Sequence, residues 1–129
     1  MKKSSILAFA PVPFALLFCS ACQERPGTGA GPAEPWRSAD PARGRAVYVA
    51  NCALCHGERA DGRGVRREGL SSDPRDFTDP LWRRAAKPEE MFRKIREGVR
   101  GTPMPAWPSL DEKTTWDLVA YLMTAGEEK

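Results

Sequence analysis

The spacing of apolar residues predicts three helices, of which the first two flank a long glycine-rich stretch. The first helix begins at Asp40, a residue type that caps helix N-termini, has Pro41 in its first turn and runs into Cys52. The second begins at Pro88 and ends at Gly98. Its buried face consists of Met91, Phe92 and Ile95.

A third predicted helix runs from about Asp111 to Ala125, with Asp111 or Ser109 as its N-cap. Its apolar residues cover a broad face that consists of Trp116, Leu118, Val119, Tyr121, Leu122 and Met123. No segment alternates apolar and polar residues as a half-buried strand does. The pattern therefore predicts an all-α domain.

Residues 57–87 connect the first two helices and contain glycines and prolines along their whole length. A structureless connection of this length is uncommon in a small domain. The foldable part of the chain is also only about 90 residues long, so it buries a modest fraction of its surface. A large apolar prosthetic group at the centre of the domain would resolve both difficulties.

The N-terminal stretch has the layout of a secretory signal. Lys2 and Lys3 precede an apolar run over residues 6–18, which is shorter than the roughly 20 apolar residues that span a membrane. Small residues then precede Cys22, as in the lipobox of bacterial lipoproteins, although Cys19 stands where that motif usually has leucine. We expect lipidation at Cys22. Cleavage by the ordinary signal peptidase is the alternative.

Proline, glycine and alanine dominate residues 23–38, which show no apolar periodicity. The chain thus divides into a signal peptide at 1–22, a flexible tether at 23–38 and a folded domain at 39–129. The first two segments predict an extracytoplasmic, periplasmic domain that is anchored to a membrane by lipid.

The charge balance gives no support to nucleic-acid binding. Lysine and arginine number 20, and aspartate and glutamate number 17. Most of this excess disappears when Lys2 and Lys3 leave with the signal. The remaining charges of both signs are interleaved, which is typical of a solvated surface, and part of that surface is a candidate docking patch for an acidic partner.

The chemistry of the chain is concentrated in Cys52-Ala53-Leu54-Cys55-His56, a C-x-x-C-H pattern. On a helical turn, residues three apart share a face, so both thiols can add to the two vinyl groups on one edge of a porphyrin. The imidazole of His56 then reaches the iron. The pattern therefore predicts one covalently attached haem c.

Other uses of this pattern fit less well. A structural zinc site needs four ligands, and His56 is the only histidine of the chain. A thioredoxin-like redox pair opens a helix that follows a strand, whereas Cys52 and Cys55 close a helix. A structural disulfide between these two cysteines is the remaining alternative.

The sixth iron ligand has to be a side chain other than histidine, and methionine is the usual choice in haem electron carriers. Met91 and Met123 lie at helical spacing among apolar residues, which indicates core packing. Met104 instead lies between Pro103 and Pro105 in an extended segment that presents its thioether. We expect Met104 to ligate the iron. Alternatively, it only covers the ring and leaves the iron five-coordinate or water-ligated.

From Asp40 to about Ala125 the chain resembles a class I cytochrome c, most specifically in the C-x-x-C-H and Pro-Met-Pro segments. Further agreement lies in residues that pack the terminal helices across each other in that family: Gly44, Tyr48, Leu118 and Tyr121. The resemblance implies the small cytochrome c fold, with crossed N- and C-terminal helices and long loops wrapped around one haem.

The segment from Gly69 to Phe77 is similar to a loop of small bacterial and oxidase-associated cytochrome domains, in which a backbone carbonyl holds the second nitrogen of the proximal histidine. The resemblance implies that Pro74 supplies this carbonyl. Candidate donors to the haem propionates are Arg75, Trp82 and Trp107.

With His56 and Met104 both on the iron, no position is open for a small-molecule substrate. The sequence therefore predicts a single-electron carrier and not an enzyme, serving extracytoplasmic respiratory or related electron transfer. Its partners would be a redox donor and acceptor, such as a membrane dehydrogenase, an oxidase or another cytochrome. Both a tethered shuttle and a subunit of a larger redox complex remain open, as does peroxidase-like or gas-sensing activity if Met104 leaves the iron.

Overall fold

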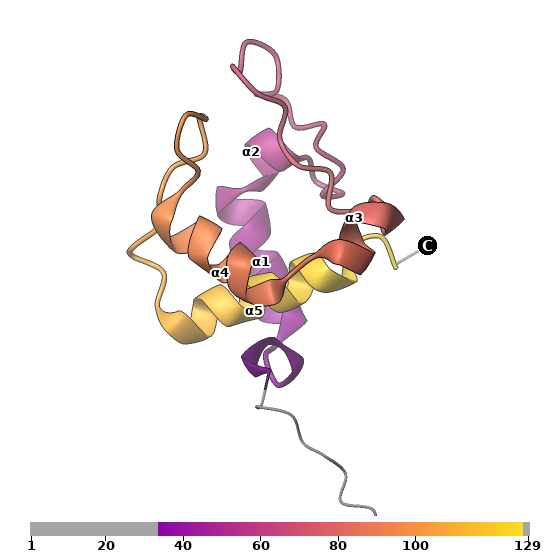
Figure 1. The fold of residues 1–129 in the computed structure, drawn as a ribbon, viewed down its shortest axis with the longest axis vertical. Coiled ribbons are helices and arrows are strands. Elements are labelled where there is room, and N and C mark those ends of the chain that lie inside the picture. The colour runs from indigo at the N-terminus through magenta and orange to yellow at the C-terminus, as the bar shows by residue number, and fades with distance from the viewer. Residues whose placement is uncertain (1–33, 128–129) are drawn as a thin grey trace, which may run out of the picture.

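The computed structural model describes residues 34–127, and every regular element among them is a helix. In chain order these are the 3-10 helix η1 (Pro35–Arg37), α1 (Pro41–Asn51), α2 (Ala53–His56), α3 (Pro80–Ala85), α4 (Pro88–Glu97) and α5 (Glu112–Thr124) (Figure 1). The predicted all-α fold is confirmed for this part of the chain. The predicted signal peptide, Cys22 and residues 23–33 of the tether lie outside the described residues.

Helix α1 begins where its capping residue predicts. The Asp40 carboxylate accepts hydrogen bonds from the backbone N–H groups of Ala42 and Arg43, at 3.0 and 3.2 Å. Helix α5 begins after Asp111, whose carboxylate accepts a hydrogen bond of 2.6 Å from the N–H of Thr114. Of the two predicted caps for this helix, Asp111 is therefore the one used, because its side chain reaches the free N–H groups of the first turn.

Two short helices lie where no helix was predicted. Helix α3 falls inside the predicted loop, where Asp79 accepts a hydrogen bond of 2.8 Å from the N–H of Leu81 and Pro80 occupies the first turn. Asp79-Pro80 repeats the signal that identified α1, so the sequence did contain the evidence for this helix. Helix η1 lies at the end of the predicted tether, and its Trp36 packs against the core.

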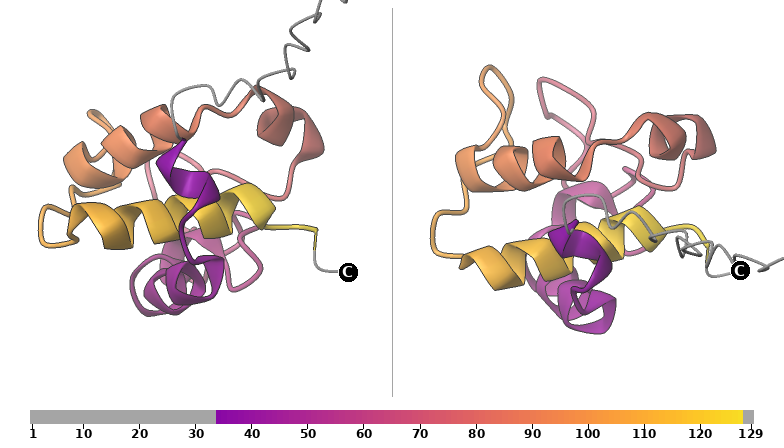
Figure 2. Two further views of the ribbon diagram at one scale, coloured as in Figure 1. Left: turned by 90° about the horizontal axis from the view of Figure 1, so that it is seen from below. Right: turned by 60° about the horizontal axis from the view of Figure 1, so that its bottom comes forward.

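Helices α1 and α5 cross at the centre of the molecule, as Figure 2 shows. Gly44 of α1 lies against the backbone of Asp117, and a Cβ at Gly44 would lie 1.9 Å from the Asp117 carbonyl oxygen. One turn further along α1, the rings of Tyr48 and Tyr121 lie 5.1 Å apart. Leu118, only 1% exposed, is buried in this core. The predicted packing of the terminal helices is therefore confirmed.

The segment after α2 folds back on that helix. The N–H groups of Gly64 and Arg66 donate to the carbonyls of Cys55 and Leu54, at 3.1 and 2.9 Å. Further along, the N–H of Phe77 donates to the Ala60 carbonyl at 2.8 Å. This long loop and the loop that follows α4 rise from the same end of the molecule, as seen at the top of Figure 1.

Candidate functional site

A cavity of about 330 Å³ is lined by α1, α2, α4, α5 and the long loops. All four residues that the sequence predicts to hold a haem line it: Cys52, Cys55, His56 and Met104. Apolar side chains from the helices complete much of its wall, namely Met91, Ile95, Leu118 and Leu122. The fold therefore gathers residues as far apart in sequence as Cys52 and Leu122 around one largely apolar space.

Cys52 and Cys55 come from one helical turn and are both free thiols. The structure therefore contains no disulfide between these two cysteines, contrary to that alternative. Burial, with a smaller contribution from neighbouring Cys55, raises the pKa of Cys52 to about 11, so this thiol is protonated at neutral pH. Within residues 34–127, no group of three or more histidine, cysteine or acidic side chains is arranged to hold a metal ion such as zinc.

The imidazole of His56 is oriented by a backbone carbonyl. Its Nδ1 lies 3.2 Å from the carbonyl oxygen of Arg75. Because a carbonyl can only accept, Nδ1 carries the proton, and Nε2 keeps a lone pair that can bind a metal. Burial lowers the pKa of His56, with the Arg75 hydrogen bond opposing this shift, so the ring favours the neutral form that a ligand needs.

The prediction that Pro74 supplies this carbonyl is wrong by one residue. The Pro74 carbonyl oxygen faces Gly62 instead, where a Cβ would lie 2.7 Å from it. Gly62 has a positive φ of 72° and donates its N–H to the His56 carbonyl at 2.8 Å. This turn determines which of two consecutive carbonyls faces the histidine, and the order of residues alone does not reveal its geometry.

Phe77 is a site residue that the sequence analysis did not identify. Its ring lies 4.9 Å from the ring of His56, tilted by 35°, and 5.2 Å from the ring of Trp82 in an edge-on arrangement. Phe77 and Trp82 both line the cavity. This ring contact adds to the hydrogen bond from Nδ1 in restricting the orientation of the imidazole. No sequence signal identified Phe77, because only the structure shows that the carbonyl two residues before it, that of Arg75, accepts the hydrogen bond from His56.

Met104 lies in a loop that is closed by backbone and side-chain hydrogen bonds. The N–H of Val99 donates to the Met104 carbonyl at 3.2 Å. The hydroxyl of Thr102 donates to the Val99 carbonyl at 2.7 Å and accepts from the Met104 N–H at 3.3 Å. Gly98 begins the loop with φ 74°, and a Cβ there would lie 2.9 Å from the Met104 carbonyl oxygen. The loop therefore needs both Gly98 and Thr102 in addition to its two prolines.

The three candidate propionate donors, Arg75, Trp82 and Trp107, also line the cavity. Lys94 does so as well, although the sequence analysis did not identify it. Met91 is both buried in the core and part of the cavity wall, while Met123 packs against the core, as predicted for both.

The donor set fits a covalent haem. Two thiols three residues apart suit the two vinyl groups, a neutral imidazole offers a free Nε2, and a thioether lines the same apolar cavity. Arginine, lysine and two indoles at this cavity supply donors for the haem carboxylates.

None of the described helices is long and apolar enough to cross a membrane.

Comparison with solved structures supports the predicted cytochrome c fold. A chain of the reducing HAO-like protein complex of Kuenenia stuttgartiensis is 30% identical, with a TM-score of 0.55 over 67% of this chain and 44% of that one. The KustC0563 c-type cytochrome is also 30% identical, with a TM-score of 0.51 over 62% of this chain and 93% of that one. The small cytochrome c fold is therefore confirmed.

Known sequences give a consistent result. The cbb3-type cytochrome c oxidase subunit FixP of Azorhizobium caulinodans is 35% identical over 65% of this chain and 27% of its own length. Subunit CcoP of Azospirillum brasilense is 33% identical over 72% of this chain and 32% of its own length. The chain thus spans about three tenths of these relatives.

A family model described as cytochrome c oxidase, cbb3-type, subunit III matches residues 39–122, which include both cysteines of the motif, His56 and Met104. The matched range begins one residue before the cap of α1 and ends within α5. It therefore includes most of the crossed helices and every residue that lines the cavity. The chain belongs to the cbb3-type cytochrome c oxidase subunit III family and contains its c-type cytochrome domain.

Proposed function

We propose that the domain holds one haem c, bonded to Cys52 and Cys55 and ligated by His56 and Met104, and that it carries single electrons. The observation that supports this most directly is the single cavity shared by all four side chains. A bound haem c supplies a reversible one-electron couple at its iron.

Each protein group has a separate task in this proposal. The two cysteines anchor the cofactor to α2, so that it cannot leave the cavity. The Arg75 carbonyl holds the Nδ1–H of His56 and keeps Nε2 available to the metal. The loop from Gly98 to Trp107 holds the thioether of Met104 against the cavity, because hydrogen bonds from Val99 and Trp107 close both of its ends.

Electron transfer is favoured over catalysis because His56 and Met104 would both bind the metal of the haem and leave no position on it for a substrate. Methionine ligation and an apolar cavity both disfavour the oxidised, more positively charged metal, so we expect a moderately high reduction potential. Peroxidase-like activity or gas sensing would require Met104 to leave the metal.

We further propose that the domain works outside the cytoplasm as part of a larger redox complex. The relatives named above are oxidase subunits, which favours a subunit over a free shuttle. In this arrangement, residues 1–22 direct export, a lipid on Cys22 anchors the chain and residues 23–38 act as the tether. The partners are then redox proteins, an oxidase among them, and not small molecules or nucleic acids.

The test is to produce the exported protein in a host that attaches haem c and to extract it with acidic organic solvent. We expect the pigment to stay with the protein and the intact mass to show one haem. A weak far-red absorption at neutral pH would indicate sulfur on ferric iron. A colourless protein, or pigment that is extracted, would contradict the proposal. If the unmodified protein lacks the far-red absorption and binds cyanide, the alternative of peroxidase-like or gas-sensing activity would be favoured.

A further inference from the structure

The hydroxyl of Tyr48 donates a buried hydrogen bond of 2.7 Å to the carbonyl of Gly57. Tyr48 is only 1% exposed and lines the same cavity as His56, which Gly57 follows directly in the chain. Its ring also packs against Tyr121 where α1 crosses α5. The hydroxyl therefore connects the crossed helices to the backbone beside the proposed iron ligand.

The Gly57 carbonyl needs to be held in place because its backbone conformation is unusual. With φ 83° and ψ 148°, Gly57 lies in a region that is essentially restricted to glycine. Its carbonyl accepts a second hydrogen bond from the N–H of Ala60 at 3.0 Å, within the same turn. Such conformations persist only where the surrounding contacts determine them, and the contact from α1 is that of Tyr48.

The turn that begins at Gly57 also orients the imidazole of His56. Within this turn the N–H of Gly62 donates to the His56 carbonyl at 2.8 Å. Gly62 lies against the Pro74 carbonyl. The next carbonyl, that of Arg75, therefore faces Nδ1 of His56 at 3.2 Å. Any movement of the turn changes the geometry of this hydrogen bond.

A second connection from the turn to the imidazole runs through Ala60. This residue is fully buried and has φ 59°, in the left-handed region that favours glycine. Its N–H donates to the Gly57 carbonyl, and its own carbonyl accepts from the N–H of Phe77 at 2.8 Å. The ring of Phe77 lies 4.9 Å from that of His56. Both connections begin at the Gly57 peptide group and end at the imidazole.

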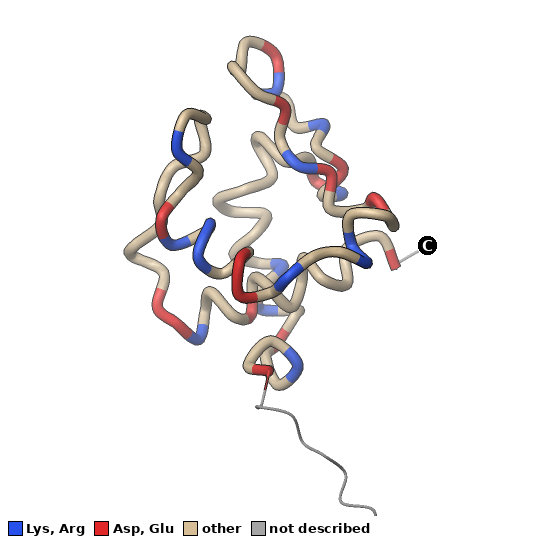
Figure 3. Tube along the Cα trace, viewed as in Figure 1, with Lys and Arg blue, Asp and Glu red and all other residues tan. Residues whose placement is uncertain are grey.

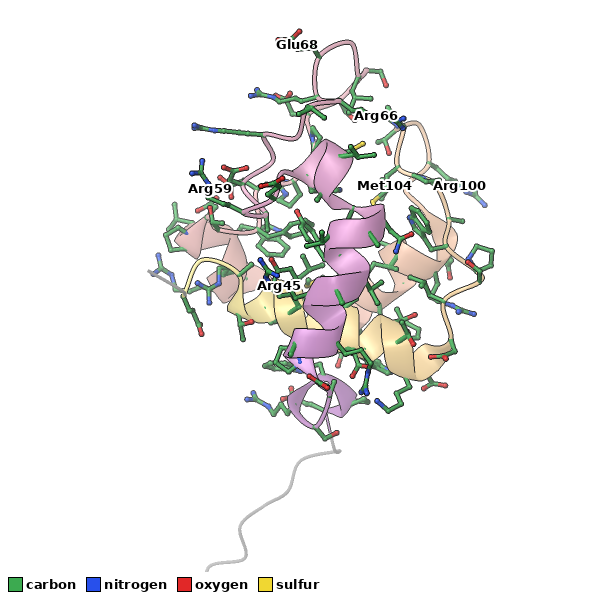
Figure 4. The ribbon with its side chains drawn as sticks, turned by 180° about the vertical axis from the view of Figure 1, so that it is seen from behind. Arg45, Arg59, Arg66, Glu68, Arg100 and Met104 are labelled. Carbon is green, nitrogen blue, oxygen red and sulfur yellow. The ribbon has the colours of Figure 1, made fainter. Side chains whose placement is uncertain are left out.

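The segment that holds these groups contains no ion pair of its own. Residues 46–57 include no lysine, arginine, aspartate or glutamate, and Figure 3 shows this stretch of the tube in tan. Its geometry therefore depends on hydrogen bonds and packing. Figure 4 shows α1 leading into α2, with Arg59 of the turn on one side and Met104 on the other. We therefore expect a change in the turn to affect His56 and to leave the Met104 loop in place.

We propose that the Tyr48 hydroxyl is a positioning group for His56, which sets the strength of the hydrogen bond from Nδ1 to the Arg75 carbonyl and thereby the reduction potential. This inference rests on the proposed function and gives Tyr48 a role beyond the packing of the terminal helices. A strong hydrogen bond from Nδ1 makes Nε2 a better electron donor and favours the oxidised metal. Without the hydroxyl, the turn loosens, this bond weakens and the reduced state gains stability.

The first test is Tyr48→Phe in the haem-loaded protein. Phenylalanine keeps the ring against Tyr121 and removes only the hydroxyl. We expect the reduction potential to rise by the equivalent of about a threefold change in the equilibrium constant for electron exchange with a mediator, since one hydrogen bond accounts for a factor of roughly two to ten. The far-red absorption that indicates sulfur on ferric iron should stay unchanged.

A second measurement is possible because His56 is the only histidine of the chain. In reduced protein that carries isotope-labelled histidine and no histidine tag, Nδ1–H gives one magnetic resonance signal. Its proton should exchange with water about five times faster in Tyr48→Phe than in the wild type, because a weaker hydrogen bond opens more often. Para-aminophenylalanine in place of Tyr48 keeps an N–H donor at this point and should restore the wild-type potential and exchange rate.

Thr115→Val is the matched control for a general loss of stability. Thr115 is fully buried, and its hydroxyl donates to the Asp111 carbonyl at 2.7 Å, the same length as the bond from Tyr48. It lies on α5 and does not line the cavity. The variant should lower the urea concentration at the midpoint of unfolding about as much as Tyr48→Phe does. It should leave the potential and the Nδ1–H exchange rate unchanged.

Three outcomes would overturn the inference. The first is an unchanged potential and exchange rate in Tyr48→Phe, and the second is an equal change of both in Thr115→Val, which would follow from stability alone. The third is para-aminophenylalanine behaving like phenylalanine, because the donor would then not be what positions His56. A wild-type protein without covalent pigment contradicts the proposed function, whereas a pigmented Tyr48→Phe with the wild-type potential contradicts only the role of Tyr48.

Discussion

Asp117 of α5 holds the N-terminal half of α1 through both its backbone and its side chain. Its carbonyl oxygen lies where a Cβ at Gly44 would be, only 1.9 Å away. Its fully buried carboxylate accepts hydrogen bonds from the Asp40 N–H at 2.7 Å and the Arg43 Nε at 2.5 Å. The sequence analysis identified Gly44 but not Asp117, because an aspartate in an amphipathic helix is expected to face solvent.

The first prediction concerns Gly44→Ala. Alanine normally stabilises a helix relative to glycine by about 1 kcal/mol. Here we expect a loss of about 2 kcal/mol or more, because the new methyl group would push α1 away from the Asp117 backbone. Urea unfolding of the haem-loaded protein measures this change. Ala50→Gly, at an exposed position of the same helix, serves as the control and should lose about 1 kcal/mol.

The second prediction is a pH-dependent contribution of Asp117. The hydrogen bond from Arg43 is the largest cause that lowers the pKa of this carboxyl to about 2, below its usual value near 3.9. The group therefore stabilises the fold above about pH 4, and the stabilisation is lost as the pH falls through the folded pKa. Asp117→Asn should lower the free energy of unfolding by about 2–3 kcal/mol at pH 7.

This difference between the wild type and Asp117→Asn should shrink in denaturant titrations below pH 4. Asp73→Asn is the matched control, because the Asp73 side chain is 74% exposed in its ion pair with Arg67. An exposed pair of this kind contributes only about 0–1 kcal/mol. A deficit for Asp117→Asn that stays constant from pH 7 to pH 2 would contradict the assignment.

The third prediction tests the thioether ligand. In Met104→Ala the iron should lose the sulfur that stabilises its reduced form. The reduction potential should fall by roughly 0.1–0.3 V, within the ~0.8 V range that axial ligands cover. Cyanide and carbon monoxide should then bind. Met123→Leu, which changes a methionine that packs against the core without lining the cavity, should leave the potential and the far-red absorption unchanged. An unchanged potential in Met104→Ala would remove this residue from the iron.

The fourth prediction concerns the Thr102 hydroxyl, which connects Val99 and Met104. Thr102→Val keeps the shape of the side chain and removes both hydrogen bonds, at about 1 kcal/mol each. The thioether should then be displaced more easily, and the alkaline pH at which the far-red absorption disappears should fall by about one unit. Thr102→Ser keeps the hydroxyl, so the far-red absorption should disappear at the same alkaline pH as in the wild type. If the far-red absorption disappears at the same pH in both variants, the hydroxyl does not position Met104.

The fifth prediction concerns membrane attachment. If Cys22 carries a lipid, the intact mass of the exported protein should correspond to a chain that starts at Cys22 with bound acyl groups. Cys22→Ser should release the protein from the membrane fraction without altering its haem spectrum. The Cys19→Ser variant should stay in the membrane fraction, because lipoprotein cleavage would remove residue 19. Equal release of both variants, or a mass without lipid, would indicate cleavage by the ordinary signal peptidase.

Much of this protein follows from short-range rules that can be read from the sequence. A capping aspartate next to proline, or a proline after lysine, determines where α1 and α4 begin. The pattern from Cys52 to His56 predicts the chemistry, because the positions of two thiols and an imidazole on one helical turn depend only on helix geometry. Met104 was identified for the same reason, since the prolines on each side restrict its backbone.

The tertiary structure decided what depends on contacts between distant segments. Arg75 and not Pro74 faces His56, because the turn at Gly62 orients the Pro74 carbonyl elsewhere. The buried carboxylate of Asp117, the ring of Phe77 beside His56 and the Tyr48 hydroxyl on the carbonyl after His56 also arise only when α1, α5 and the long loop come together. Residue order determines local conformation and the identity of the chemical groups. Which atoms of separate segments meet depends on the packing of the whole chain, and no local pattern encodes it.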